Sequence, residues 1–296
     1  MAFKSGFVAV IGKPNVGKSS LVNALVGEKV SITSPKAQTT RNRIFGIKNT
    51  PDYQIVFVDT PGVQHTKTKL GEYMNKATDG ATADVDAIVI VLDALRVGQE
   101  DYKIIERFKN VKCPVFLVIN KIETTTYEKM YPILAKLNEY KFVKKYITTS
   151  AHRKINVDEL EEDLVECLPE GEPFYPTDQY TDKSLRFMCQ EIIREKALLF
   201  LQEEIPHGLA IEITKFDEGK DLIKIDATII TENERHKSII IGSKGVMLKQ
   251  IGMSARRDIE ELAGAKVMLE LFVKVKKDWK DDMSTLTDLG FSKKDL

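Results

Sequence analysis

The sequence predicts two domains in series: an α/β domain with a mostly parallel sheet and helices on both faces, then a smaller α+β domain. Its 296 residues suit two domains of ordinary size. In the first half, short β-rich apolar runs alternate with longer helical patterns, as is typical of a parallel sheet. After a proline-rich segment, the order changes to helix, two strands, two helices and a strand. With 43% apolar and 30% charged residues, the chain can bury a core and is unlike a disordered one.

The first domain is expected to contain five buried strands and four helices. Each strand is a short, mostly apolar run rich in Val, Ile and Phe, and the helical segments show three- and four-residue spacing of apolar positions. The expected strands are Phe7–Ile11, Ile55–Asp59, Ala87–Leu92, Val115–Ile119 and Tyr146–Thr149. The expected helices are Lys18–Val26, Glu100–Phe108, Glu128–Tyr140 and Val157–Cys167.

A linker and a second domain follow. The prolines and glycine between Leu168 and Thr181 exclude a regular element there. The predicted elements beyond it are a helix over 182–204, strands over 209–216 and 222–231, helices over 234–241 and 246–262, and a strand over 266–275. No element is expected in the tail, which holds Trp279. We therefore place the first domain at residues 1–170, the linker at 171–181, the second domain at 182–277 and the tail at 278–296.

Composition excludes several classes of protein. No apolar run reaches eighteen residues, so we expect no membrane span. The N-terminal apolar run is too short for a secretory signal. Cys113, Cys167 and Cys189 lie far apart and form no C-x-x-C pair, which fits a protein of the reducing cytoplasm without a disulfide framework or zinc site.

A phosphate-binding loop follows the first expected strand. The pattern G-x-x-x-x-G-K-[ST] lies between a strand and a helix, as a P-loop requires. Its backbone N–H groups would cradle phosphate oxygens at the helix N-terminus. Lys18 would reach the β and γ phosphates, and Ser19 would ligate Mg²⁺. The expected phosphate-binding residues are Gly12, Lys13, Pro14, Asn15, Val16, Gly17, Lys18, Ser19 and Ser20.

A second motif lies forty residues further on, at the end of another buried strand. It comprises Asp59, Thr60, Pro61 and Gly62, followed by Val63. Asp59 would hold Mg²⁺ through a water, and the Gly62 amide would sense a γ-phosphate. Between the two motifs, residues 31–43 are rich in hydroxyls, and Thr39 or Thr40 would complete the Mg²⁺ shell. We prefer Thr40, although this stretch also fits a simple surface loop.

Two later strand ends are expected to bind the base. A carboxylate at Glu123 can accept from guanine N1–H and N2–H₂, a donor pair that adenine lacks, so guanine is predicted. Lys121 would pack its stem across the base, and Asn120 would brace neighbouring loops. The Ala151 amide would meet guanine O6. The full set at this end is Asn120, Lys121, Ile122, Glu123, Ser150, Ala151 and His152.

These motifs in this order resemble the G motifs of small GTPases. The P-loop, the segment Gln38–Arg41 and the Asp59 motif are similar to those of the Era family of translation-associated (TrmE-Era-EngA-like) bacterial GTPases. The second half resembles the same family at 181–187, 191–196, 239–245 and 269–275. The resemblance implies a P-loop GTPase domain followed by a type II KH domain, a Mg²⁺ cofactor, and binding to the 3′ end of 16S rRNA during assembly of the 30S subunit. It also implies a cytoplasmic protein with peripheral contact to the inner face of the cell membrane. The sequence leaves the oligomeric state open, and a monomer is the default expectation.

The sequence departs from the family's pattern at two positions of the base site. Glu123 replaces the usual Asp and adds one methylene, which should alter guanine affinity by about 1 kcal/mol while keeping specificity. His152 replaces the usual Lys or Leu and follows Ala151, whose backbone amide is expected to contact guanine O6.

Slow intrinsic hydrolysis is expected. Val63 stands where Ras-like enzymes carry a water-orienting glutamine, with Gln64 as a minor alternative. The catalytic set is expected to be Lys18, Thr40, Gly62 and Asn15. In related enzymes the P-loop asparagine helps to bind K⁺, so a K⁺ requirement is a further hypothesis for Asn15.

An RNA-binding loop is predicted in the second domain. Gly242 to Gly245 matches the G-x-x-G loop with which KH domains clamp a nucleic-acid backbone. Residues 235–257, which surround this loop, carry six basic side chains and no acidic one. A basic nucleic-acid-binding face and an ordinary solvated helix face explain these charges equally well. We expect the bases to lie along a groove lined by Ile240, Val246, Leu248 and Ile251, although the isoleucines would be core residues in any case. The predicted RNA-binding residues are Ile240, Ile241, Gly242, Ser243, Lys244, Gly245, Lys237, Lys249, Arg256 and Arg257.

Three functions compete at this level. The first is a GTP-hydrolysing switch that couples nucleotide state to RNA binding. The second is a nucleotide-gated RNA chaperone in which hydrolysis only resets binding, with a role in cell-cycle or membrane-linked signalling. The third, a GTPase of tRNA modification, is disfavoured because the sequence shows no catalytic cysteine motif or additional catalytic domain.

Overall fold

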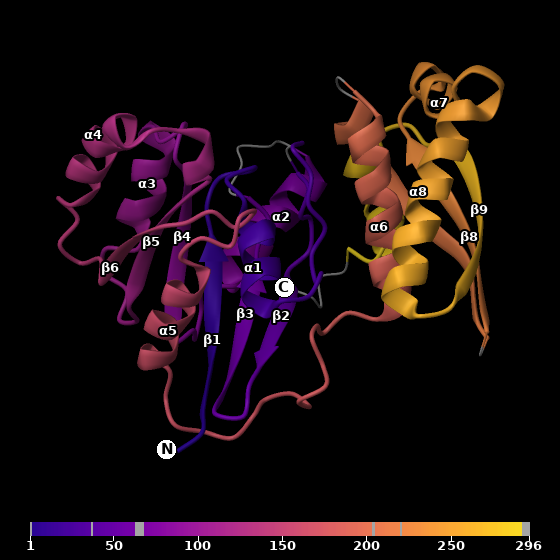
Figure 1. Cartoon of the computed structure of the whole chain (residues 1–296). Coiled ribbons are helices and arrows are strands. Elements are labelled where there is room, and N and C mark those ends of the chain that lie inside the picture. Colours follow the sequence, from indigo (N-terminus) through magenta and orange to yellow (C-terminus); the bar gives the residue numbers. More distant parts are fainter. Residues whose placement is uncertain (1, 37, 63–67, 203–204, 220, 292–296) are drawn as a thin grey trace.

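The computed structural model describes residues 2–36, 38–62, 68–202, 205–219 and 221–291. Two bodies lie side by side, and an extended segment beneath them joins α5 (Val157–Cys167) to α6 (Leu185–Phe200) (Figure 1). After the second body the chain returns, and Leu286 and Phe291 pack with Tyr73 and Met74 of the first body. The expected succession of an α/β domain and an α+β domain is confirmed.

A six-stranded sheet in the order β2-β3-β1-β4-β5-β6 forms the centre of the first domain. Strand β2 pairs antiparallel with β3, and the other neighbours are parallel. Because parallel strands end at one edge, residues that follow β1, β3, β4 and β5 meet there. The strands are β1 (Lys4–Ile11), β2 (Ile44–Asn49), β3 (Tyr53–Asp59), β4 (Ala87–Asp93), β5 (Val115–Asn120) and β6 (Lys145–Thr148).

Helices cover both faces of this sheet, which explains why its strands read as continuous apolar runs. Helices α1 (Lys18–Val26) and α5 (Val157–Cys167) pack on one face, in a core that includes Leu21, Leu160 and Phe57. Helices α3 (Gln99–Arg107) and α4 (Tyr127–Leu137) pack on the other, where the core includes Ile105 and Leu137.

The second domain packs helices against a three-stranded sheet in the order β7-β8-β9. Strands β7 (Ala210–Glu218) and β8 (Leu222–Thr231) are antiparallel, whereas β8 and β9 (Lys266–Val275) are parallel. The parallel pair needs a crossover, and α7 (Glu234–Ile241) with α8 (Val246–Ala263) supplies it. Helix α6 (Leu185–Phe200) packs beside α8. The G-x-x-G turn therefore lies between α7 and α8, as predicted.

Several elements of the structure differ from the sequence-based expectation. Strand β2 is an edge strand with a half-buried pattern and a central glycine, so its apolar signal is weak. Helix α2 (Lys69–Gly80) is polar overall. In the tail, a short turn (Trp279–Asp281) and α9 (Met283–Asp288) are ordered by packing rather than by local sequence. The predicted helix over 182–204 is shorter, because Ser184 caps its start and it ends at Phe200.

The tail packs back against the first domain. Trp279 is fully buried, and its Nε1–H donates to Gly208 O at 3.1 Å. The same apolar cluster contains Tyr73 and Met74 of α2 and Leu286 of α9. The two domains therefore share a core that includes the helix after the Asp59 motif.

Within the described ranges, no helix combines the length and apolarity that a membrane crossing requires.

Candidate functional site

The P-loop turns from β1 into α1 at the carboxyl edge of the sheet. Gly17 has φ 97°, and a Cβ there would lie 2.3 Å from Asn120 Nδ2, so glycine is required. Lys18 is buried, and its ammonium donates to Gly12 O at 3.1 Å and Lys13 O at 2.9 Å. Burial lowers the pKa of Lys18 to about 8, against the opposing attraction of Asp59. A buried cation thus faces the place where phosphates would bind.

The three predicted metal ligands lie together. The Ser19 hydroxyl is 2.7 Å from Thr40 Oγ1 and donates to Asp59 Oδ2 at 2.7 Å. Asp59 is fully buried, and its Oδ1 has no partner among the described residues. Burial raises the pKa of Asp59, although Ser19 and Lys18 oppose the shift. Hard oxygen donors around an unpaired buried carboxylate oxygen fit Mg²⁺.

The choice of Thr40 over Thr39 agrees with these positions. Thr39 Oγ1 turns away from Ser19 and donates to Lys36 O at 2.6 Å. The other residues of the second motif are packed tightly. Thr60 Oγ1 donates to Val10 O at 2.8 Å, and a Cβ on Gly62 would lie 2.6 Å from Pro14 N. Val63 and Gln64 lie outside the described residues.

At the base end, Asn120 braces two loops as expected. Its Nδ2 donates to Val16 O at 3.1 Å, and its Oδ1 accepts from Ala151 N at 3.0 Å. The Ala151 amide therefore donates to Asn120 in this structure, and its contact with guanine O6 stays a prediction. Lys121 donates to Asn15 O and pairs with Asp93 at 2.8 Å, and Asp93 was not anticipated.

The remaining residues of the base motifs lie close by. Glu123 Oε2 is buried without a partner in the described structure. The Ile122 amide donates to Thr149 O at 3.2 Å. Ser150 is buried and its hydroxyl accepts from Arg153 N at 3.1 Å, while His152 is exposed. The unpaired oxygen of Glu123 is what a base with two N–H donors would satisfy.

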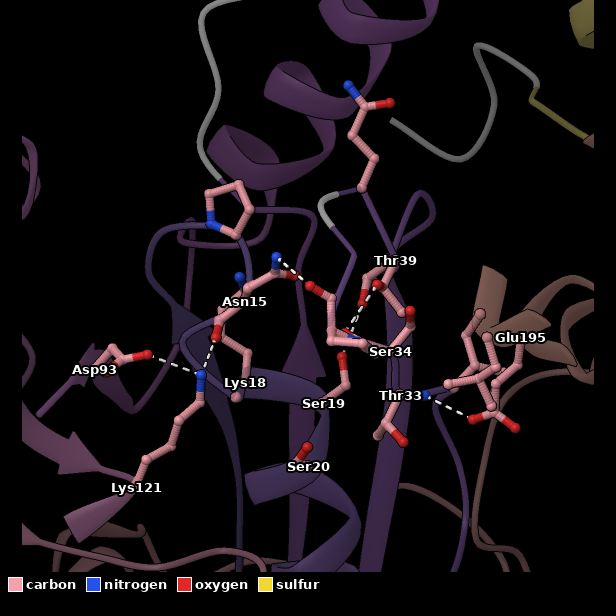
Figure 2. A pocket seen from close by; sticks show the side chains of 18 of the residues that line it. Asn15, Lys18, Ser19, Ser20, Thr33, Ser34, Thr39, Asp93, Lys121 and Glu195 are labelled. Atoms are coloured by element: carbon pink, nitrogen blue, oxygen red, sulfur yellow. Dashed lines mark hydrogen bonds and ion pairs between the residues drawn. The ribbon is translucent and has the colours of Figure 1, made fainter. Parts of the chain in front are cut away.

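A cavity of about 740 Å³ extends from the P-loop, Thr40 and Gly62 to Lys121, and Glu123 and Ala151 are not among the residues that line it. Its lining extends beyond the predicted residues to the second domain, as Figure 2 shows for Glu195 of α6, which faces Thr33. The second domain contributes Glu195, Lys196 and Leu199. Residues of both domains therefore line the cavity.

Charged residues of α6 hold residues 33–41 of the first domain. Arg194 forms a buried ion pair with Glu191 and donates to Thr39 O. Arg41 is 2% exposed and donates to Leu209 O at 2.7 Å, while its Nε and Nη2 lack partners among the described residues. Burial, and then the charge of Arg194, lower the pKa of Arg41. The sequence signal for this surface was a run of charges in an otherwise apolar helix.

A groove of about 380 Å³ lies beside the G-x-x-G turn. Gly242 has φ 74°, and a Cβ there would lie 2.7 Å from Met247 Cβ. Two expected groove residues, Ile240 and Ile251, are instead fully buried in the domain core. The groove is lined by Gly245, Leu248, Lys249, Gly252, Met253, Arg256, Leu269 and Leu271.

The other predicted RNA-binding residues surround this groove unevenly. Ser243 and Lys244 are exposed in the turn, and Ile241 is half-buried at the end of α7. Lys237 and Arg257 are not among the residues that line the groove, and Arg257 Nη2 lies 3.4 Å from Asp258 Oδ1. Lys249 and Arg256 are therefore the predicted basic residues that line the groove itself.

Two family models match the chain. One, described as "50S ribosome-binding GTPase", covers residues 7–121, and the other, described as "KH domain", covers residues 204–280. GTPase Era of Clostridium kluyveri is 48% identical over 290 residues, covering 97% of this chain and 99% of the relative. GTPase Era of Caldicellulosiruptor saccharolyticus is 47% identical over 300 residues and covers both chains fully.

Two solved structures match nearly the whole chain with a TM-score of 0.94 and 39% identity. One is an Aquifex aeolicus Era variant bound to GDP and AlF4⁻, and the match covers 98% of this chain and 100% of that one. The other is Era with MgGDPNP and nucleotides 1506–1542 of 16S ribosomal RNA, with 98% and 99% covered.

Proposed function

This chain belongs to the Era family of GTPases, and from that premise we propose that it is a Mg²⁺-dependent GTP-hydrolysing switch that binds the 3′ end of 16S rRNA and assists 30S assembly and maturation. The observation that carries the proposal is the grouping of Ser19, Thr40 and Asp59 beside a buried P-loop lysine. The rRNA and Mg²⁺ parts are supported by the solved Era complex that holds MgGDPNP and 16S rRNA. Because 16S rRNA belongs to the small subunit, we favour that subunit over the 50S.

Phosphate binding is assigned to the P-loop backbone and Lys18. The ammonium of Lys18 offsets negative charge on the β and γ phosphates, and Thr40 and Gly62 close over the γ side. When bound at Ser19, Thr40 and Asp59, Mg²⁺ neutralises charge that develops between the β and γ phosphates. Because Val63 carries no polar group, no side chain at that position orients the attacking water. Slow turnover without a partner follows.

A K⁺ ion beside the P-loop is a separate proposal. Asn15 Nδ2 donates to Pro35 O at 2.9 Å, which holds the side chain between the P-loop and the segment around Thr40. Its Oδ1 is an oxygen ligand of the kind K⁺ accepts. We expect a higher kcat in KCl than in NaCl at equal ionic strength, and Asn15→Ala should remove the difference. Equal rates in both salts would overturn the K⁺ proposal alone.

RNA binding is assigned to the groove beside α8. Gly242 and Gly245 allow close approach of phosphates, Leu248 and Met253 offer apolar surface to bases, and Arg256 adds charge. Phosphate contacts fix position, whereas hydrogen bonds to base edges select the sequence.

The test is binding of labelled GDP, GTP and ATP with Mg²⁺, together with a short RNA copied from the 3′ end of 16S rRNA. Gly242→Asp should abolish RNA binding, because the side chain meets Met247 and its charge repels phosphate. The matched control is Gly264→Asp at the far end of α8, where φ is also positive at 63° and a Cβ meets nothing within 4 Å. Equal binding of ATP would refute guanine selectivity, and unchanged RNA affinity in Gly242→Asp would remove the KH assignment.

Location and membrane contact are proposed from the family resemblance, whereas a monomer is the default assembly state. We place the protein in the cytoplasm as a monomer with peripheral membrane contact, and its cysteines are unbridged. Flotation with anionic vesicles and sedimentation of the purified chain test these two points.

A further inference from the structure

One buried carboxylate joins the nucleotide-facing loop to the second domain. Glu195 of α6 is 2% exposed. Its Oε1 accepts from Thr33 N at 2.8 Å, as Figure 2 shows, and its Oε2 accepts from Lys29 Nζ at 2.6 Å. Thr33 belongs to the segment that leads to Thr40 and lines the same cavity. Movement of this segment therefore changes the surroundings of Glu195.

The network continues from Glu195 to the RNA-binding helix. Lys196 Nζ lies 3.2 Å from Glu195 Oε2 and forms an ion pair with Asp258 of α8. Lys29 Nζ also lies 3.6 Å from Asp258 Oδ2. Asp258 is two residues beyond Arg256, which lines the groove, and α8 begins directly after the G-x-x-G turn. A rigid helix thus connects the network to the RNA site.

Lys196 and Asp258 favour each other's charged forms. Burial lowers the pKa of Lys196, but the hydrogen bond that Lys196 donates to Asp258 and the charge of Glu195 outweigh it, so the net shift is upward. For Asp258, burial raises the pKa, and the lysines and Arg257 outweigh that effect and lower it. Two lysines and two carboxylates balance one another across the interface. Lys29 is 39% exposed, whereas Lys196 is largely buried. Removal of the charge of Glu195 or Asp258 therefore leaves Lys196 incompletely paired, which weakens this docked arrangement.

We propose that Glu195 is a positioning residue that couples the nucleotide state of residues 33–40 to the RNA affinity of the α8 groove. The inference rests on the proposed function, because it needs both ligands to bind. Linkage makes the effect reciprocal: nucleotide changes RNA affinity by the same factor by which RNA changes nucleotide affinity.

The experiment measures RNA affinity in the presence of GDP and of a non-hydrolysable GTP analogue, for the full chain. The wild-type ratio should be about fivefold or more. In Glu195→Gln, the amide keeps an oxygen for the Thr33 N–H but turns an NH₂ donor toward Lys29 and Lys196. The ratio should fall close to one. Asp258→Asn breaks the network from α8 and should lower the ratio as well.

A matched control is Glu161→Gln, which neutralises another buried glutamate. Glu161 accepts a hydrogen bond from the Tyr53 hydroxyl and pairs with Lys48, and all three residues belong to the first domain. These contacts include none of the residues that join Glu195 to the groove. Glu161→Gln should keep the wild-type ratio. The fall in the ratio for Glu195→Gln then does not result from a general loss of stability on neutralising a buried glutamate. A wild-type ratio of one, or an undiminished ratio in both Glu195→Gln and Asp258→Asn, overturns the coupling role. Failure of the wild type to bind guanine nucleotide or RNA overturns the proposed function itself.

Discussion

The depressed pKa of Lys18 predicts a loss of nucleotide affinity at alkaline pH. In the free protein, burial lowers this pKa to about 8. A bound polyphosphate favours the protonated ammonium, so binding raises the pKa and takes up a proton wherever free Lys18 is neutral. Affinity is therefore highest well below pH 8 and falls as the pH rises through that value.

The size of this effect follows from the titration of one group. Free Lys18 is about 10% neutral at pH 7 and about 90% neutral at pH 9, so GDP affinity should fall about tenfold between them, or about 1.4 kcal/mol. Titration with labelled GDP at constant ionic strength measures the fall. Calorimetry in two buffers should detect uptake of about 0.9 proton at pH 9 and about 0.1 at pH 7. Guanosine, which has no phosphate, is the control ligand. Constant GDP affinity without proton uptake would refute the reasoning.

Three substitutions test other parts of the structure. Trp279→Ala should lower the free energy of unfolding by about 3–5 kcal/mol, measured by urea denaturation with circular dichroism, because it empties a buried interdomain position; an unchanged midpoint would show that tail packing contributes nothing. Gly62→Ala brings a Cβ to 2.6 Å from Pro14 N and should weaken binding of a GTP analogue more than of GDP, whereas equal losses would contradict a role in sensing the γ-phosphate. Glu123→Asp should change GDP affinity by no more than about tenfold and leave ATP excluded, and a larger change would mean that the extra methylene reshapes the base site.

Much of the fold could be predicted because its signals are local. Buried parallel strands read as apolar runs, and helices α1 and α5 were predicted with the observed bounds. Edge strand β2 and helix α2 lack such a signal, since each buries only part of its surface. In the second domain the helical period identified apolar positions but not their partners. Ile240 and Ile251 were therefore assigned to the groove although they fill the core.

The sequence by itself determined the loops whose chemistry lies within a few residues: the P-loop, the Asp59 motif and the G-x-x-G turn. These depend on glycines and polar groups that the backbone brings together locally. The tertiary structure decided which distant groups complete them. Glu195 lies 162 positions from Thr33, and Trp279 lies 71 positions from Gly208. Their contacts depend on how the linker and tail let the domains dock, and charge or apolar periodicity along one helix does not specify a partner on another domain.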